Sequence, residues 1–338
     1  MITSGRKPTQ STAVRRSLLA TVAVTSLFGV AACGGDTAAQ TESDASATTV
    51  QVEDNNGTQT ISVPPQSVVA TDNRTFQTLD DWGVELSAGA VALMPETVSY
   101  TQQEDIVDLG MHREPDLEAV VAAEPDLIIN GQRFAQYADE FTELAPDATV
   151  LDVDPREGEP LAQELKRQTT ALGTIFEHET EAEELNTALD EAIARVKDSY
   201  DPQDTVMAVI TSGGDIGYSA PGNGRTLGPL FPMLELTPAL EVDDSSHNHQ
   251  GDDVSVEAIA AADPDWLLVM DRDAAISADE PEYEPAAEVL EDSPALEDVS
   301  AIEQDQIVYM PADTYLNEGI QTYTEYLNSF AEALESAQ

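Results

Sequence analysis

The sequence predicts an α/β protein of two Rossmann-like lobes, each with a mostly parallel sheet, joined by a long rigid helix. Three observations support this fold class: apolar strand-like segments alternate with amphipathic helices, a helix–Pro–strand unit occurs twice, and a long helical segment separates its two copies. Ligands of open α/β sheets bind beyond the carboxyl ends of the strands. Two facing lobes therefore predict a ligand cleft between them.

The first 32 residues have the features of an export signal. A basic stretch that ends in Arg15 and Arg16 precedes a mostly apolar run of 16 residues, from Ser17 to Ala32. This run is shorter than the roughly 20 residues that span a bilayer, so we predict a signal peptide over residues 1–32. The arginine pair leaves both general secretory and twin-arginine export open.

Cys33 is the only cysteine of the chain and follows Val30-Ala31-Ala32. This small-residue motif resembles a bacterial lipoprotein lipobox, in which the thiol receives a lipid. A secretory signal without a lipid is the alternative. With residues 33–50 as a flexible tether, the motif predicts an exported protein, lipid-anchored at Cys33 on the outer face of the cytoplasmic membrane.

The N-terminal α/β lobe is expected over residues 51–160. Residues 51–63 alternate around an Asn56-Gly57 turn and predict a β-hairpin. Residues 67–70 then predict a buried strand, and the α/β units follow it.

An internal repeat defines the second lobe. The segment DLEAVVAAEPDLII at residues 116–129 matches SVEAIAAADPDWLL at residues 255–268, which lies 139 positions later. Each copy predicts a helix, a proline that ends it and a strand. Because this period is too long for a solenoid unit, it indicates two similar lobes, the second over residues 201–338.

Residues 161–200 predict the connecting helices. The segment 179–197 has one apolar stripe, formed by Ala182, Leu185, Ala188, Leu189, Ala192, Ile193 and Val196. A helix of this length favours a stiff connection and small movements of the lobes.

The charge of the chain excludes several partners. Its 65 acidic and 14 basic residues give a formal net charge of −51. Removal of residues 1–32 takes away four basic residues and no acidic ones, which leaves 10 − 65 = −55. Such a surface repels nucleic acid and anionic lipids, so membrane contact is expected only through the lipid anchor. We expect a monomer.

The few basic residues fall at informative positions. Arg133 and Arg272 follow the strand in each copy of the repeat, Arg74 follows the first strand, and Arg225 follows a glycine-rich turn. All four are candidate ligand-binding residues, because these positions map to the rim of the predicted cleft. A salt bridge to a nearby carboxylate is the alternative for any single surface arginine. The shared register of Arg133 and Arg272 instead predicts an anionic ligand in the cleft, because guanidinium groups bind oxyanions and stack on aromatic rings.

Two histidines and a tyrosine are further candidates. His247 and His249 lie in one polar loop, and their spacing leaves a metal contact and a solvated loop equally open. Tyr315 follows Pro311 outside the apolar stripe of the C-terminal helix. It would either contact a ligand or pack beneath that helix.

Several motifs carry a resemblance to a known family over nearly all of the mature chain. They are the opening hairpin, SVVA at 67–70, LG at 109–110, EPDLE at 114–118, EPDLII at 124–129, HQG at 249–251, VSVE at 254–257, DPDWLLV at 263–269, MDR at 270–272 and TYL at 314–316. The chain resembles the substrate-binding lipoproteins of iron-siderophore ABC importers, and within them the subgroup that binds ferric catecholate siderophores.

The resemblance implies roles for these residues. His249, with His247 as the alternative, and Tyr315 would complete the iron shell. Arg133, Arg225 and Arg272 would surround the catecholate oxygens. It implies no intrinsic cofactor, Fe(III) bound as the siderophore complex, and ABC permease subunits as partners. Imidazole, phenolate and catecholate all suit Fe(III), and arginines offset the negative charge of such a complex.

Other functions are weaker alternatives. A receptor for haem, cobalamin or a hydroxamate siderophore would have the same architecture. A free manganese or zinc receptor would need several ligands from both lobes. A lipid-anchored surface hydrolase is the alternative from another class, but the chain has no Gly-x-Ser-x-Gly nucleophile motif. We therefore predict a receptor and not an enzyme.

Overall fold

The computed structural model describes residues 48–110, 114–242 and 245–338. Cys33, the signal segment and most of the expected tether lie outside these residues. Within them, no helix combines the length and the apolar character needed to cross a membrane. Strands β1 (Thr48–Asp54) and β2 (Gly57–Val63) form the predicted hairpin. Strand β1 begins three residues earlier than expected, because Thr48 to Val50 pair with the end of β2.

Lobe 1 contains the first predicted parallel sheet. Its five strands are all parallel and lie in the order β5-β4-β3-β6-β7. Strands β3 and β6 are buried on both faces, which is typical of parallel sheets covered by helices. The elements of this lobe are β3 (Val68–Ala70), α1 (Phe76–Asp81), β4 (Ala88–Gly89), η1 (Val91–Leu93), η2 (Ser99–Gln102), β5 (Val107–Asp108), α2 (Leu117–Ala122), β6 (Leu127–Asn130), η3 (Gln132–Tyr137), α3 (Ala138–Leu144) and β7 (Thr149–Asp152).

Lobe 2 repeats this architecture with one reversed strand. Strands β10, β8, β11 and β12 are parallel in that order, and β9 pairs antiparallel with β8. The elements are β8 (Thr205–Ser212), β9 (Asp215–Tyr218), α6 (Leu230–Leu234), β10 (Thr237–Pro238), α7 (Val256–Ala262), β11 (Trp266–Asp271), α8 (Arg272–Ile276), α9 (Ala286–Glu291), α10 (Ser300–Glu303), β12 (Ile307–Tyr309), η4 (Thr314–Leu316) and α11 (Ile320–Ala337).

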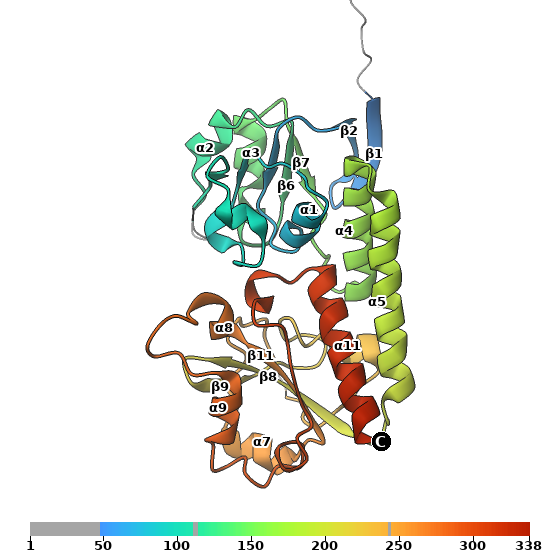
Figure 1. The fold of residues 1–338 in the computed structure, drawn as a ribbon, viewed down its shortest axis with the longest axis vertical. Helices are drawn as coiled ribbons and strands as arrows, with labels where there is room; N and C mark the ends of the chain where they lie inside the picture. Colours follow the sequence, from blue (N-terminus) through green and yellow to red (C-terminus); the bar gives the residue numbers. More distant parts are fainter. Residues whose placement is uncertain (1–47, 111–113, 243–244) are drawn as a thin grey trace, which may run out of the picture. The chain divides into compact units, whose positions relative to one another are not determined.

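The connection is a pair of helices, α4 (Leu161–Phe176) and α5 (Glu179–Ser199), and not one continuous helix. Glu177 ends α4 in the left-handed conformation, and His178 precedes α5. Helix α5 buries four residues of the predicted stripe: Ala182, Leu189, Ala192 and Val196. It packs along α4 and α11, so the two lobes share one helical layer (Figure 1).

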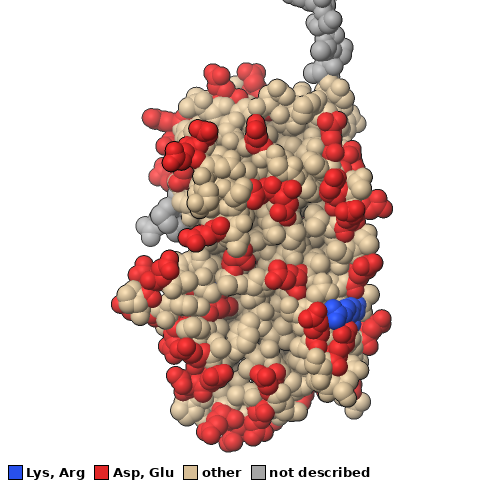
Figure 2. Space-filling model, viewed as in Figure 1, with Lys and Arg blue, Asp and Glu red and all other residues tan. Residues whose placement is uncertain are grey.

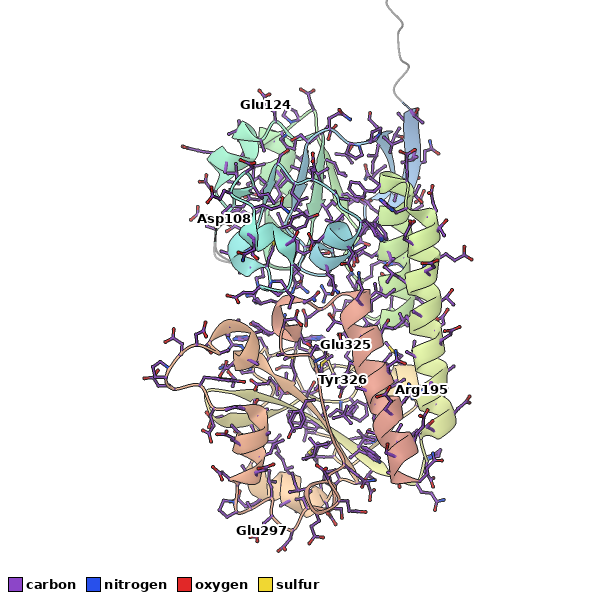
Figure 3. All side chains as sticks on the ribbon, in the orientation of Figure 1. Asp108, Glu124, Arg195, Glu297, Glu325 and Tyr326 are labelled. Carbon is purple, nitrogen blue, oxygen red and sulfur yellow. The ribbon has the colours of Figure 1, made fainter. Side chains whose placement is uncertain are left out.

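Each face of the lobe 2 sheet has its own core. Along β8, Val206, Ala208 and Ile210 pack with α5 and α11, whereas Met207 and Val209 pack with α7 and α9. Tyr326 lies on the face of α11 toward the sheet and is fully buried (Figure 3). This alternation follows the two-residue period of a strand.

The repeat seen in the sequence is a structural repeat. The α2–β6 unit in lobe 1 corresponds to α7–β11 in lobe 2. Each helix starts with a side-chain cap: Asp116 accepts hydrogen bonds from two backbone N–H groups and Ser255 from one. In each sheet the strand order reverses beside the repeat strand, between β3 and β6 and between β8 and β11. These switch points are where open α/β sheets form ligand crevices.

The surface shows the acidity of the composition. The face drawn in Figure 2 carries many Asp and Glu side chains and only a small patch of Lys and Arg. In such an acidic background, arginines grouped at one place are a distinctive feature.

Candidate functional site

The loop after β6 presents Arg133 at the switch point of lobe 1. Gly131 packs directly on the carboxyl group of Asp72, which follows β3, and a Cβ atom on Gly131 would lie 2.7 Å from Asp72 Cγ. Gln132 then has a φ of 50°, in the left-handed region. This close approach and turn place Arg133 at the start of η3.

Arg272 is the first residue of α8, which directly follows β11 at the corresponding point of lobe 2. Its Nη1 donates to Ser212 Oγ, at the end of β8, over 3.1 Å and to Asp273 over 2.9 Å. Asp271 caps helix α8 by accepting from the Ala274 N–H. The switch point therefore fixes the Arg272 side chain from two strands.

Three predicted arginines surround one tyrosine ring. The guanidinium carbons of Arg133, Arg225 and Arg272 lie 5.3, 4.9 and 4.8 Å from the centroid of Tyr315. Tyr315 is in η4 and only 3% exposed. Arg133 comes from lobe 1 and the other residues come from lobe 2, so this cluster forms only where the lobes meet. We call these four residues the arginine–tyrosine cluster.

The cluster favours negative charge. Burial would raise the pKa of Tyr315, but hydrogen bonds from Arg133 and Arg272 and the charges of Arg133 and Arg225 hold the pKa below its usual value. Guanidinium groups over an aromatic face also add cation–π attraction. The arrangement can therefore bind an anion and supply a phenolate oxygen at the same place.

His249 lies in the field of the same arginines. Although His249 is an exposed residue, partial desolvation of its ring and the charges of Arg272, Arg225 and Arg133 lower its pKa. The lowered pKa favours the neutral imidazole, which is the form that can ligate a metal. His247 instead lines a cavity beside Arg225. The described residues contain no group of three or more His, Cys, Asp or Glu side chains that could hold a metal ion by themselves.

Glu318, which the sequence reasoning missed, holds Arg225. Its carboxylate accepts from Arg225 Nη2 over 2.9 Å and from Arg225 Nε over 3.3 Å. Burial raises the pKa of Glu318, but Arg225 and Arg74 outweigh this effect and lower the pKa to about 2. No local pattern distinguishes this glutamate from the other acidic residues of the chain.

Arg74 does not join the arginine–tyrosine cluster. Its Nη1 pairs with Asp154 over 2.8 Å, and its Nη2 lies 3.9 Å from Glu318. Asp72 is fully buried beside it, where burial and the charge of Asp154 outweigh Arg74 and raise the pKa of Asp72 to about 7. Arg74 is thus part of a partly buried ionic network with Asp154, Glu318 and Asp72.

Two cavities border the site. One of about 690 Å³ is lined by Arg74 and residues 155–163 on one side and by Arg225, His247 and α6 on the other. A second, of about 420 Å³, lies between residues 95–97 of lobe 1 and residues 274–280 of lobe 2. Both volumes fall in the usual range of ligand pockets, about 300–1,000 Å³.

Direct hydrogen bonds also join the lobes. Thr97 Oγ1 donates to Asp313 over 2.6 Å, and Asn317 Nδ2 donates to Gln77 over 2.8 Å. Thr78 Oγ1 donates to Gln321 over 3.0 Å. These contacts and the shared helices agree with a stiff connection.

Comparisons with known proteins relate this site to a family. The petrobactin-binding protein YclQ of Bacillus subtilis is 27% identical over 330 residues, 95% of this chain and all of the relative. The ferric-anguibactin-binding protein FatB of Vibrio anguillarum is 28% identical and covers 79% of this chain and 81% of the relative. The structure of the catecholate-siderophore binding protein VctP of Vibrio cholerae shares the fold, with a TM-score of 0.71 and 21% identity over 86% of this chain and all of VctP.

The family itself is shown by a match over most of the folded chain. Residues 68–314 match the periplasmic binding protein family, and this range contains the elements from β3 to the start of η4. Members of this family bind substrates and are not enzymes, which confirms the prediction of a receptor. With its two α/β lobes and the arginine–tyrosine cluster where they meet, the chain belongs to the periplasmic binding protein family.

Proposed function

We propose that this protein captures a ferric catecholate siderophore at the arginine–tyrosine cluster and delivers it to an ABC permease for iron uptake. The observation that carries the proposal is the convergence of Arg133, Arg225 and Arg272 on the buried Tyr315. Catecholate oxygens leave a ferric complex with negative charge, which arginines bind well. An uncharged hydroxamate complex would not need three guanidinium groups.

The rest of the chain fits an exported receptor. The signal segment and Cys33 would anchor it by a lipid on the outer face of the cytoplasmic membrane, and residues 34–47 would let it reach the permease. We propose that it acts as a monomer, since the site is complete within one chain. Relatives named for petrobactin and anguibactin binding support a siderophore as the cargo.

A panel of ligands tests this function. We expect ferric catecholates to quench the tyrosine and tryptophan fluorescence of the protein at sub-micromolar to micromolar concentration. The iron-free catecholates, a hydroxamate siderophore, haem and cobalamin serve as comparison ligands. Binding of haem or cobalamin without binding of any ferric catecholate would reject the proposal.

Tyr315 and His249 are proposed to complete the iron shell of a tetradentate catecholate. We expect Tyr315→Phe to shift the visible charge-transfer band of the bound ferric complex, because the phenolate oxygen is lost. His249→Ala should also alter the band, whereas His247→Ala should leave it unchanged. A band that responds to His247→Ala and not to His249→Ala would exchange the roles of the two histidines.

A further inference from the structure

Glu318 connects both lobes through a single buried carboxylate. In lobe 2 it accepts hydrogen bonds from Arg225 and from the Thr226 hydroxyl, the latter over 2.5 Å. From lobe 1, Gln132 Nε2 donates to it over 3.3 Å, and Arg74 Nη2 lies 3.9 Å away. The Glu318 side chain is only 1% exposed. A carboxylate with this many donors holds each of them in a defined place.

The turn that carries Arg225 is built around this carboxylate. The Arg225 carbonyl accepts from Ser219 Oγ over 3.0 Å, and the Thr226 carbonyl accepts from the Tyr323 hydroxyl over 3.0 Å. Thr226 has a φ of 64°, which is unfavourable for a β-branched residue. Its hydroxyl bond to Glu318 compensates for that strain. Gly224 and Gly228 pack closely against the backbone of this glycine-rich turn, where a Cβ atom would not fit.

The lobe 1 partner of Glu318 adjoins another arginine of the cluster. Gln132 lies between Gly131, which packs on Asp72, and Arg133. Its left-handed backbone and its bond to Glu318 therefore define where η3 begins. One carboxylate thus contacts the two segments that carry Arg225 and Arg133.

We infer that Glu318 is a positioning residue of the binding site, which directs Arg225 toward Tyr315 and holds the Arg133 turn against lobe 2. It acts through the arginines and does not itself touch the ligand. The inference rests on the proposed function and adds to it the residue that fixes the geometry of the arginines.

The first test compares three variants by their affinity for a ferric catecholate. Glu318→Gln removes the charge, Glu318→Asp keeps the charge and shortens the reach, and Glu335→Gln is the control. Glu335 lies on α11 and also pairs with an arginine, Arg195 of α5, over 2.7 Å. We expect both Glu318 variants to weaken binding by about ten- to hundredfold and the control to leave it unchanged.

A double-mutant cycle separates positioning from general damage. In an Arg225→Ala background, Glu318→Gln should lose most of its effect, because the residue through which it acts is absent. Fully additive effects would overturn the inference. Wild-type affinity in Glu318→Asp would also overturn the inference. It would mean that the carboxylate charge is sufficient without the longer side chain of glutamate.

A measurement without ligand keeps the inference testable on its own. The Arg225 Nε–H resonance in NMR, assigned by its loss in Arg225→Lys, should shift in Glu318→Gln and not in Glu335→Gln. If Glu318→Gln does not fold, two variants of Thr226 replace it. Thr226→Ala loses the hydroxyl that donates to Glu318 and should shift the Arg225 resonance, by less than we expect for Glu318→Gln, whereas Thr226→Ser keeps the hydroxyl and should not shift it. An unchanged resonance in Thr226→Ala would count against the inference. A shifted resonance in a protein that binds no catecholate would overturn the proposed function while supporting Glu318 as the residue that positions Arg225.

Discussion

Replacing Arg133 and Arg272 together by alanine is expected to weaken the binding of a ferric catecholate by about a thousandfold. Hydrogen bonds to charged groups contribute about 1.5–3 kcal/mol each, and a tenfold change in affinity corresponds to about 1.4 kcal/mol. Both guanidinium groups lie within 5.3 Å of the Tyr315 ring centroid and come from different lobes. Each single variant should lose about ten- to hundredfold by the same reasoning.

Arg195→Ala with Lys197→Ala is the matched control for this double variant. Both residues lie on α5, where Figure 3 labels Arg195. Their salt bridges are with Glu335 and Glu235. This control changes the net charge by the same amount without altering the cluster, so affinity should stay within about twofold. Unchanged affinity in both Arg133→Ala and Arg272→Ala would contradict the proposed site.

Asp72 is expected to make the protein less stable as the pH rises toward neutrality. The pKa of Asp72 is about 7 in the folded protein and 3.8 in an ordinary aspartate. The folded state therefore binds this proton more tightly, and its stabilising effect, complete below pH 3.8, is lost as the pH rises through about 7. At 1.36 kcal/mol for each pKa unit, the loss amounts to about 4 kcal/mol.

Urea denaturation of Asp72→Asn at several pH values measures this effect. An asparagine side chain has an acceptor oxygen and an NH2 group with two donor hydrogens, so it resembles the protonated carboxyl in shape and in offering both a donor and an acceptor. Unlike Asp72, it cannot ionise beside Asp154. We expect the variant to be more stable than the wild type at pH 8 and to differ little from it near pH 4. Asp147→Asn, at an exposed position of the same lobe, is the control.

The opposite pH dependence would refute this prediction. If the wild type gained stability relative to Asp72→Asn between pH 4 and pH 8, Asp72 would be ionised and favourably paired with Arg74. Glu318 adds no pH dependence between pH 4.5 and pH 8, since its pKa is about 2 and its stabilising effect is lost only below pH 4.5. Below pH 4.5 its effect is the same in the wild type and in Asp72→Asn, so it cancels in their comparison.

Much of the fold follows from local sequence patterns. The repeated helix–Pro–strand unit predicted two lobes, because a helix cap, an apolar period and a proline each act within a few residues of chain. The same register put Arg133 and Arg272 at equivalent strand ends. Residues 161–200 predicted connecting helices with an apolar stripe from residue 179, and the structure begins α5 at Glu179. The left-handed backbone of Glu177, which ends α4, became visible only in the structure.

The site required the tertiary structure for its acidic members. The sequence nominated Arg133, Arg225 and Arg272 because basic residues are scarce in this chain. It nominated Tyr315 because this residue follows Pro311 outside the helical stripe and belongs to the TYL motif that carries the family resemblance. It did not identify Glu318 or Asp72, because the chain has 65 acidic residues and no local pattern shows which of them become buried beside charged partners. Glu318 meets Gln132 and Arg225 from positions 186 and 93 residues away. The sequence alone thus determined the two lobes and the cationic residues at the strand ends, whereas burial beside partners distant in the chain decided which carboxylates hold them.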